Sequence, residues 1–167
     1  MKVSIIITCF NLEKYISRAI NSCLNQTMHE DEFEIIVVDD GSQDNSWNII
    51  KSYGKIIRAI KIEKNSGVAL ASNKGILISK GENIVRVDGD DFVNRNFIFT
   101  LYEVLRWNKD FGFVYCDNII VNDKEERIQS KKTLEVLLDH GAGVMFRKNL
   151  MYEIGLYDES LRNREDY

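Results

Sequence analysis

The 167-residue chain contains no proline, three cysteines and two histidines. Without proline, no proline-rich linker marks a domain boundary, and the length suits one domain with a sizeable core. Cys9, Cys23 and Cys116 are odd in number and widely spaced, which matches neither a disulfide framework nor a CxxC metal site. We expect buried free thiols in a reducing cytosol. His29 and His140 are too few for a His-rich zinc site.

Long apolar runs are also missing. Residues 3–8 are too short a run for a signal peptide and no cleavage site follows them, and nothing approaches the length of a membrane span. The net charge is −4, with acidic and basic residues interspersed, which argues against a nucleic-acid surface. We therefore expect a cytoplasmic protein with no transmembrane segment and no nucleic-acid partner.

Two kinds of periodicity alternate along the chain. Short runs of β-branched apolar residues predict buried strands, and apolar residues recurring every three or four positions predict helices. The predicted strands are residues 3–8, 34–38, 56–62, 83–87, 112–116 and 143–146. Five helices are predicted: one that follows residue 11, one that begins near residue 46, one at 67–79, one at 97–107 and a short one that ends at residue 154. This alternation predicts an α/β domain with a mostly parallel sheet, flanking helices and right-handed crossovers.

Local signals predict how some of these elements end. We expect Asn11 to cap the first helix and Ser42 or Asp44 to cap the second. Gly81 is placed to end the third helix. Residues 118–129 predict a hairpin, and from that hairpin we expect the sheet to have a mixed edge.

Carboxylates gather directly after two of the predicted strands. The sequence DGDD at 88–91 follows one strand, and DDGS at 39–42 follows another. Ligands of open α/β sheets bind beyond the carboxyl ends of strands, so two clusters at one edge could face one ligand. Carboxylates packed this closely repel one another, and a hard divalent ion shared with a diphosphate is their natural partner. A solvated acidic turn and an ordinary strand-to-helix turn are the plainer alternatives.

Several other ligand sites are excluded or left open by the motifs. A calcium loop is excluded because Phe92 holds the third ligand position and Val93 replaces the required glycine. The first turn, residues 8–11, lacks GxGxxG, and no P-loop occurs, so metal bridging is the remaining route to a diphosphate. Phe10 is either a core aromatic or a ring that stacks on a planar base. Asp40 is placed to accept hydrogen bonds from a base or a ribose hydroxyl.

Taken in order, these motifs resemble those of family 2 glycosyltransferases. The matching segments are residues 3–11 (VSIIITCFN), 37–42 (VVDDGS), 65–75 (NSGVALASNKG), 87–91 (VDGDD), 155–159 (GLYDE) and 165–167 (EDY). The resemblance covers essentially the whole chain. It implies a Rossmann-like GT-A fold and an inverting transfer of a hexosyl or N-acetylhexosaminyl unit from a nucleotide-sugar, most simply UDP-linked.

The resemblance also implies roles for single residues. The implied substrate-binding positions are Thr8, Phe10, Asp40, Asn73, Asp88 and Glu165. Asp88 and Asp90 match the family's DxD motif, which implies that Asp90 binds Mg²⁺ or Mn²⁺ directly and that Asp88 binds the ribose or a metal-bound water. Asp166 matches the general base that takes a proton from the acceptor hydroxyl. The implied partners are a nucleotide-sugar donor and a carbohydrate or lipid-linked acceptor, which could bring the protein to a membrane surface.

Two departures from the family bear on function. Ser72 stands where the family often has an arginine near the nucleotide, and the charge of Lys74 lies on a different helix face. The chain also stops at Tyr167, so we expect residues 1–167 to be one glycosyltransferase catalytic domain, truncated at its C-terminal, acceptor side. A non-catalytic nucleotide-sugar-binding module is the alternative. A sugar-1-phosphate nucleotidyltransferase would need a Gly-rich first turn, which is missing. A phosphorylated receiver domain would need an acidic pair after the first strand, where Thr8 stands.

Overall fold

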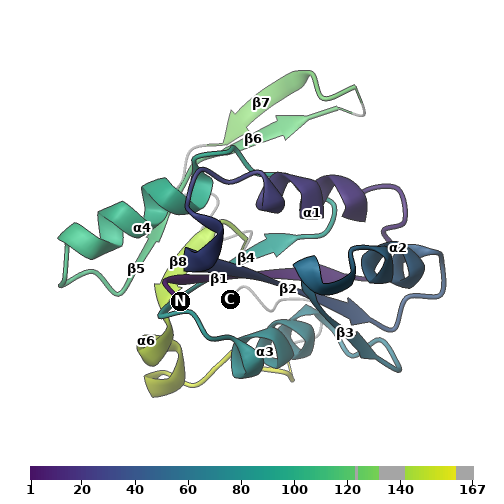
Figure 1. The fold of residues 1–167 in the computed structure, drawn as a ribbon, viewed down its shortest axis with the longest axis horizontal. Helices are drawn as coiled ribbons and strands as arrows, with labels where there is room; N and C mark the ends of the chain where they lie inside the picture. The colour runs from purple at the N-terminus through teal and green to yellow at the C-terminus, as the bar shows by residue number, and fades with distance from the viewer. Residues whose placement is uncertain (123, 132–141, 161–167) are drawn as a thin grey trace.

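The computed structural model describes residues 1–122, 124–131 and 142–160, and its centre is a six-stranded sheet (Figure 1). The strand order is β3-β2-β1-β4-β8-β5. Four neighbouring strands run parallel: β3 (Arg58–Ile62), β2 (Phe33–Asp40), β1 (Val3–Cys9) and β4 (Asn83–Asp88). The predicted α/β fold with a mostly parallel sheet is confirmed.

The central strands are apolar because helices cover both faces of the sheet. Every residue of β1 is buried, as expected for a parallel strand inside a doubly covered sheet. At the edge, β3 alternates between exposed and half-buried residues. It begins two residues later than predicted because a short 3₁₀ helix, η2 (Gly54–Ile56), comes before it.

Two helical layers enclose the sheet (Figure 1). On one face, α1 (Ile16–Leu24), α2 (Ser46–Ser52) and α4 (Phe97–Trp107) pack against the larger core cluster. On the other, α3 (Val68–Ile78) and α6 (Lys148–Glu153) pack over Ile6, Ile36 and Ile84. A short 3₁₀ helix, η1 (Glu30–Glu32), leads into β2. Because strand side chains alternate, the face that a residue occupies can be read from these clusters.

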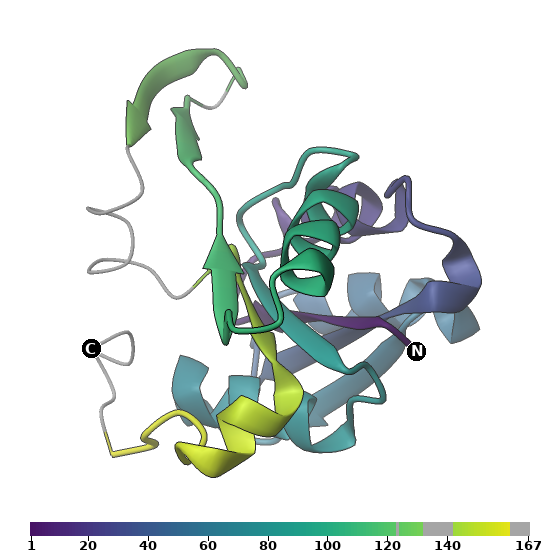
Figure 2. The same ribbon diagram turned by 90° about the vertical axis from the view of Figure 1, so that its left-hand side faces the viewer.

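The edge of the sheet is mixed, but the hairpin is not the cause. β6 (Asn118–Val121) and β7 (Arg127–Lys131) form the predicted hairpin as a separate two-stranded sheet, which stands apart from the main sheet in Figures 1 and 2. The mixed edge arises from β8 (Val144–Arg147), which lies antiparallel between β4 and β5 (Phe113–Tyr115). β8 carries the buried Val144 and Met145 into the core, whereas the hairpin exposes its isoleucines.

The first two helices do not start with the predicted cap residues. α1 begins only at Ile16, and Asn11, with φ 54°, joins two turns: its Oδ1 accepts from the Gln43 amide at 2.8 Å. Its own amide donates to Ser42 Oγ at 2.9 Å, so the Asn11 cap prediction is wrong. The prediction for the second helix is also wrong, because the N-cap of α2 is Asn45 and makes no side-chain cap hydrogen bond. Asp44, one residue earlier, supports the helix start through its Oδ1, which accepts from the Ser46 amide at 3.0 Å.

Gly81 does not end α3, which stops at Ile78, with Ser79 already extended. The need for glycine at position 81 comes from close packing. A Cβ added there would lie 2.4 Å from the amide nitrogen of Ser4, closer than any side chain tolerates. The prediction that Gly81 ends the third helix is therefore wrong, and the glycine is needed for its close approach to β1.

Candidate functional site

The candidate site lies at the edge where β2, β1 and β4 end. In the parallel register, Thr8 of β1 lies opposite Asp88 of β4. Asp40, the last residue of β2, shares a face with Val38, and that face is the one that α3 covers. The structure therefore brings the side chains of Thr8, Asp40 and Asp88 to one edge and one face of the sheet, in line with ligand sites of open α/β sheets.

Asp40 is buried and holds the loop that leads into α3. Both of its carboxylate oxygens accept from the Ser66 amide, at 3.0 and 3.1 Å, and Oδ2 also accepts from the Gly67 amide at 2.8 Å. Gly67 has φ 97° and is the N-cap of α3. Since each carboxylate oxygen has two lone pairs, these bonds leave acceptor capacity for a ligand, and the predicted contact with a nucleoside stays a prediction.

The acidic turn after β4 is tight. The Asp91 amide donates to the Asp88 carbonyl at 3.0 Å, and a Cβ at Gly89 would lie 2.6 Å from the Thr8 carbonyl oxygen. The Asp88 side chain is 30% exposed, while Asp90 and Asp91 are exposed. The turn thus holds one half-buried carboxylate beside β1 and directs the next ones to solvent.

These carboxylates fit an ion shared with a ligand better than an ion held by protein alone. Among the residues that the structure describes, no three His, Cys, Asp or Glu side chains gather to enclose a metal. Mg²⁺ in proteins commonly keeps one or two carboxylates and takes its other ligands from substrate phosphates and water. The carboxylates of Asp88 and Asp90 are of the type that such an ion takes, and their binding of a metal stays a prediction.

Arg86 belongs to this site, although sequence reasoning gave it no role. Its side chain is only 4% exposed, and its Nε lies 3.4 Å from Asp88 Oδ1. The guanidinium carbon also lies 5.6 Å from the centre of the Tyr157 ring. Its signal was a charged residue inside the otherwise apolar run at 83–87, because a buried charge needs a partner. Here the arginine balances the charge of the Asp88 carboxylate.

Asn73 connects α3 to the segment that precedes residue 160. Its Nδ2 donates to the Tyr157 carbonyl and to Glu159 Oε1, both at 2.9 Å, and its Oδ1 accepts from the Tyr157 amide at 3.0 Å. The buried side chain therefore fixes a segment that the family motif assigns to the acceptor side. A direct contact between Asn73 and a substrate stays a prediction.

The neighbours of Asn73 on α3 differ in burial. Ser72 is buried, and its Oγ has no hydrogen-bond partner among the described residues. Lys74 is exposed, so its charge lies away from the buried face that Ser72 occupies. Lys74 is thus not placed to supply a cation where the family often has arginine, whereas Arg86 brings one to the same face of the sheet.

The other predicted site residues are Phe10, Glu165 and Asp166. Phe10 is 40% exposed, so the core-aromatic alternative is wrong and its ring is accessible beyond β1. Glu165 and Asp166 lie outside the described residues, and their predicted roles remain predictions.

Asp39 and Cys9 lie at the same ends of β2 and β1 but on the other face of the sheet, and sequence reasoning gave them no role in the site. Asp39 is fully buried, and neither carboxylate oxygen has a hydrogen-bond partner among the described residues. Beside it, burial raises the pKa of the Cys9 thiol to about 11, and the nearby Asp39 charge contributes to this rise. Burial likewise raises the pKa of Cys23 to about 12. These thiols are protonated at neutral pH, and the prediction of buried free cysteines is confirmed for Cys9 and Cys23, whereas Cys116 is free but only half-buried.

The sheet order, the covering helices and the acidic turn define a glycosyltransferase domain of the GT-A type. The family model described as Glycosyl transferase family 2 matches residues 4–159, and the chain belongs to this family.

Named relatives share part of the chain. Poly(ribitol-phosphate) beta-N-acetylglucosaminyltransferase TarP of Staphylococcus aureus is 39% identical over 104 residues, 60% of this chain and 32% of TarP. An uncharacterized glycosyltransferase of Rickettsia typhi is 35% identical over 182 residues, 99% of this chain and 56% of that protein. The chain thus spans between about a third and just over half of the length of these relatives.

Solved structures share the fold over nearly the whole chain. Residues 1–349 of S. aureus TarS in complex with UDP give a TM-score of 0.82 at 25% identity, covering 99% of this chain and 53% of that one. A mannosyltransferase of Pyrobaculum calidifontis in complex with GDP-Man and Mn²⁺ gives 0.76 at 18% identity, covering 99% and 50%. In the part of the chain that the structure describes, no helix has both the length and the apolar character needed to cross a bilayer.

Proposed function

We propose that this chain forms the donor-binding part of an inverting glycosyltransferase that uses a UDP-sugar and Mg²⁺ or Mn²⁺. The observation that carries the proposal is the acidic turn at the end of β4, next to Thr8 and on the same sheet edge as Asp40. The TarS structures were solved with UDP and with UDP-GlcNAc, which supports a UDP-linked donor and transfer of an N-acetylhexosaminyl or hexosyl unit.

The chain's own residues divide the work at this edge. Thr8, the exposed ring of Phe10 and Asp40 bind the nucleoside, and Asp88 and Asp90 would hold the divalent ion. When bound, that ion neutralises charge on the departing diphosphate. Arg86 holds the Asp88 carboxylate in place, because its buried guanidinium lies 3.4 Å from Asp88 Oδ1 and carries the opposite charge.

The acceptor side is assigned from the motif at the end of the chain. Asp166 takes the proton from the acceptor hydroxyl, which then attacks the anomeric carbon from the face opposite the diphosphate and inverts it. The acceptor is a carbohydrate or a lipid-linked hydroxyl compound. A domain that binds nucleotide-sugar without transfer is the alternative, and the uncharged Ser72 favours it because it leaves less positive charge near the donor.

The direct test measures UDP binding with and without the ion. Calorimetry with Mn²⁺ and with EDTA should show affinity that depends on the metal, because the diphosphate otherwise meets like charge at residues 88–91. Asp90→Asn should largely remove the metal-dependent part. Asp110→Asn is the matched control, since it removes another exposed carboxylate, in the loop before β5 and at the opposite end of the strands.

Equal UDP affinity in Mn²⁺ and EDTA would contradict the metal role, and equal loss in both variants would contradict the role of Asp90. Turnover of a panel of UDP-sugars then separates an enzyme from a binding module. Metal-dependent binding without transfer by any form of the chain would favour the module.

A further inference from the structure

Three side chains of the α1 segment, spaced four residues apart, hold the backbone that follows the acidic turn. The hydrogen bonds are Arg18 Nη2 to the Asp90 carbonyl (2.7 Å), the Val93 amide to Ser22 Oγ (3.1 Å), Gln26 Nε2 to the Asn94 carbonyl (2.9 Å) and the Ile98 amide to Gln26 Oε1 (3.1 Å). Arg18 and Ser22 are four residues apart on one side of α1, and Gln26 follows two residues after the helix ends, so the helix and the residues just after it support the segment. Arg18 is the member that touches the turn itself.

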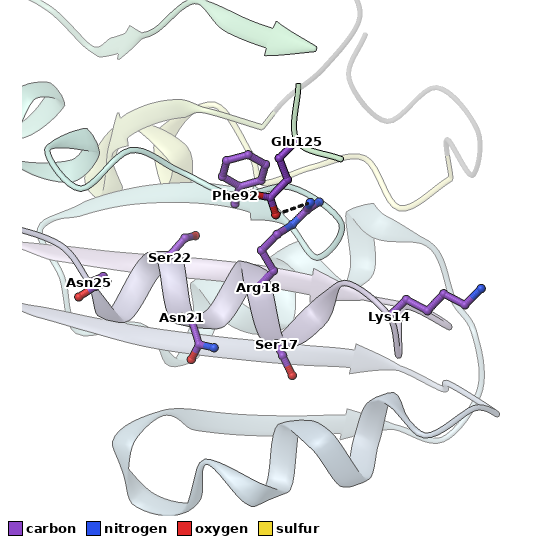
Figure 3. A pocket seen from close by; sticks show the side chains of 8 residues that line it. All are labelled: Lys14, Ser17, Arg18, Asn21, Ser22, Asn25, Phe92 and Glu125. Atoms are coloured by element: carbon purple, nitrogen blue, oxygen red, sulfur yellow. Dashed lines mark hydrogen bonds and ion pairs between the residues drawn. The ribbon is translucent and has the colours of Figure 1, made fainter. Parts of the chain in front are cut away.

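The Arg18 guanidinium is held from several directions. Its central carbon lies 4.6 Å from the centre of the Phe92 ring and 5.6 Å from that of Tyr15. Its Nη1 lies 3.5 Å from Glu125 Oε1, which belongs to the turn of the β6–β7 hairpin. Figure 3 shows Arg18 and Glu125 meeting beside α1, with Phe92 next to them. These three residues line a groove of about 540 Å³. One side chain thus joins a helix, the acidic turn and the hairpin.

The hydrogen bond from Arg18 fixes the main chain at Asp90, whereas the Asp90 carboxylate is exposed. Hydrogen bonds from a charged donor are shorter and stronger than neutral ones, and a planar guanidinium packed on rings keeps its donors in a set direction. With the carbonyl of residue 90 held, the range of directions open to the Asp90 carboxylate is narrowed.

We propose that Arg18 is a positioning residue for the acidic turn, acting through the Asp90 backbone, and that Glu125 holds the guanidinium in this position. The inference rests on the proposed function, because it assigns the Asp90 carboxylate to the ion that the donor diphosphate shares. Residues that orient metal ligands typically change metal affinity or activity by about 10–100-fold when altered.

The test compares Arg18→Met with a matched arginine elsewhere. Arg106 on α4 also pairs with a carboxylate, Glu103 at 3.0 Å, and also lies on an aromatic ring, Trp107 at 5.4 Å, but it lies outside the acidic turn. Arg18→Met should raise the Mn²⁺ concentration that half-saturates UDP binding by about 10–100-fold. Arg106→Met should leave it unchanged. Arg18→Lys, which keeps the charge and a donor, should fall in between.

Amide hydrogen exchange in the metal-free chain supplies a second readout. Exchange at residues 89–93 should become faster in Arg18→Met and stay unchanged in Arg106→Met. If Arg18→Met does not fold, Glu125→Gln and Arg18→Lys replace it, since each leaves a donor at the Asp90 carbonyl. Each should give a smaller shift in the same direction, and no shift in either would overturn the inference.

The outcomes separate the inference from the function on which it rests. Wild-type UDP affinity that is equal in Mn²⁺ and EDTA removes the metal role, and the inference falls with it. If wild-type UDP binding depends on the metal, but Arg18→Met matches Arg106→Met in half-saturating Mn²⁺ concentration and in amide exchange at residues 89–93, only the role of Arg18 is overturned.

Discussion

Asp40 shows how one carboxylate can serve both the fold and the site. Its oxygens bind the Ser66 and Gly67 amides, and these bonds set the start of α3. A nucleoside held by the remaining lone pairs of Asp40 would therefore contact a group that is already fixed in place, which lowers the entropy lost on binding. The same coupling means that a substitution at Asp40 changes stability and binding together, so Asp90 is the cleaner position for testing donor binding.

Glu34 of β2 makes stability depend on pH. Its carboxylate accepts from Ser4 Oγ at 2.7 Å, from Arg58 Nη1 at 2.9 Å and from the Lys80 amide. Burial alone would raise the pKa of Glu34, but these hydrogen bonds outweigh burial and lower it. A carboxyl whose pKa is lower in the folded state contributes stability above its unfolded pKa, and this stability is lost as the pH falls through the folded pKa.

We therefore expect Glu34→Gln to lower the free energy of unfolding at pH 7. The difference from wild type should shrink as the pH falls below about 4.3, the ordinary value for glutamate. Urea unfolding at a series of pH values measures this difference. Glu63→Gln, at an exposed position, serves as the control, and its difference from wild type should show no such trend with pH. A difference that is constant between pH 7 and pH 3 would contradict the assignment.

At the scale of elements, α3 controls the segment at 157–159 through Asn73. Asn73→Ala removes the three hydrogen bonds of the amide to that segment, each worth about 1 kcal/mol. Amide hydrogen exchange at residues 155–160 should accelerate, while exchange in β1 should stay slow.

The control for this prediction is Asn48→Ala. Asn48 is exposed on α2 and its amide bonds Asn45, a local contact. Unchanged exchange at 155–160 in Asn73→Ala would show that the segment is held by its other contacts, such as Tyr157 against Arg86.

Sequence periodicity predicted the elements well because it reports local packing. The predicted bounds of α4 match the structure, and the predicted first strand falls one residue short of β1. What periodicity does not report is which strand pairs with which. The hairpin at 118–129 was found, but the mixed edge came from β8, whose position depends on contacts with β4 and β5.

The site residues likewise fall into those that the sequence predicted and contacts that it could not predict. The acidic residues could be predicted from their place after strands, because parallel strands end at one edge. The partners of Asp40 and Asp88 could not: the Ser66 amide is 26 positions from Asp40, and the Arg86 contact depends on the burial of the strand. Asn11 and Gly81 were predicted to start and end helices, and both predictions are wrong, because their roles depend on contacts with residues distant in sequence, Ser42 and Gln43 for Asn11 and Ser4 for Gly81.

At the scale of the whole molecule, the chain covers about half of the TarS chain that it matches. If Asp166 is the base, Asp166→Asn should lower transfer by about two to four orders of magnitude while donor binding barely changes. Extending the chain by its natural downstream residues, where they exist, should raise transfer more than UDP affinity, because added contacts hold the base in place. Single-turnover transfer in both lengths, with and without the substitution, measures this.

Two results would count against this assignment. Unchanged transfer in the extended Asp166→Asn variant would exclude Asp166 as the base and make Glu165 the next candidate. A parallel loss of UDP affinity would show that the substitution acts on the fold and not on proton transfer.

The position of β8 has a consequence for synthesis on the ribosome. The strands β3-β2-β1-β4 are all present once Asp88 has emerged, but β5 has no neighbour in the sheet until β8 arrives between it and β4. β5 ends at Tyr115 and β8 begins at Val144, a stretch that takes on the order of seconds to translate. During that interval the edge of β4 offers unpaired backbone groups to other chains. The nascent protein should therefore be most prone to aggregation, and most in need of a chaperone, at that stage.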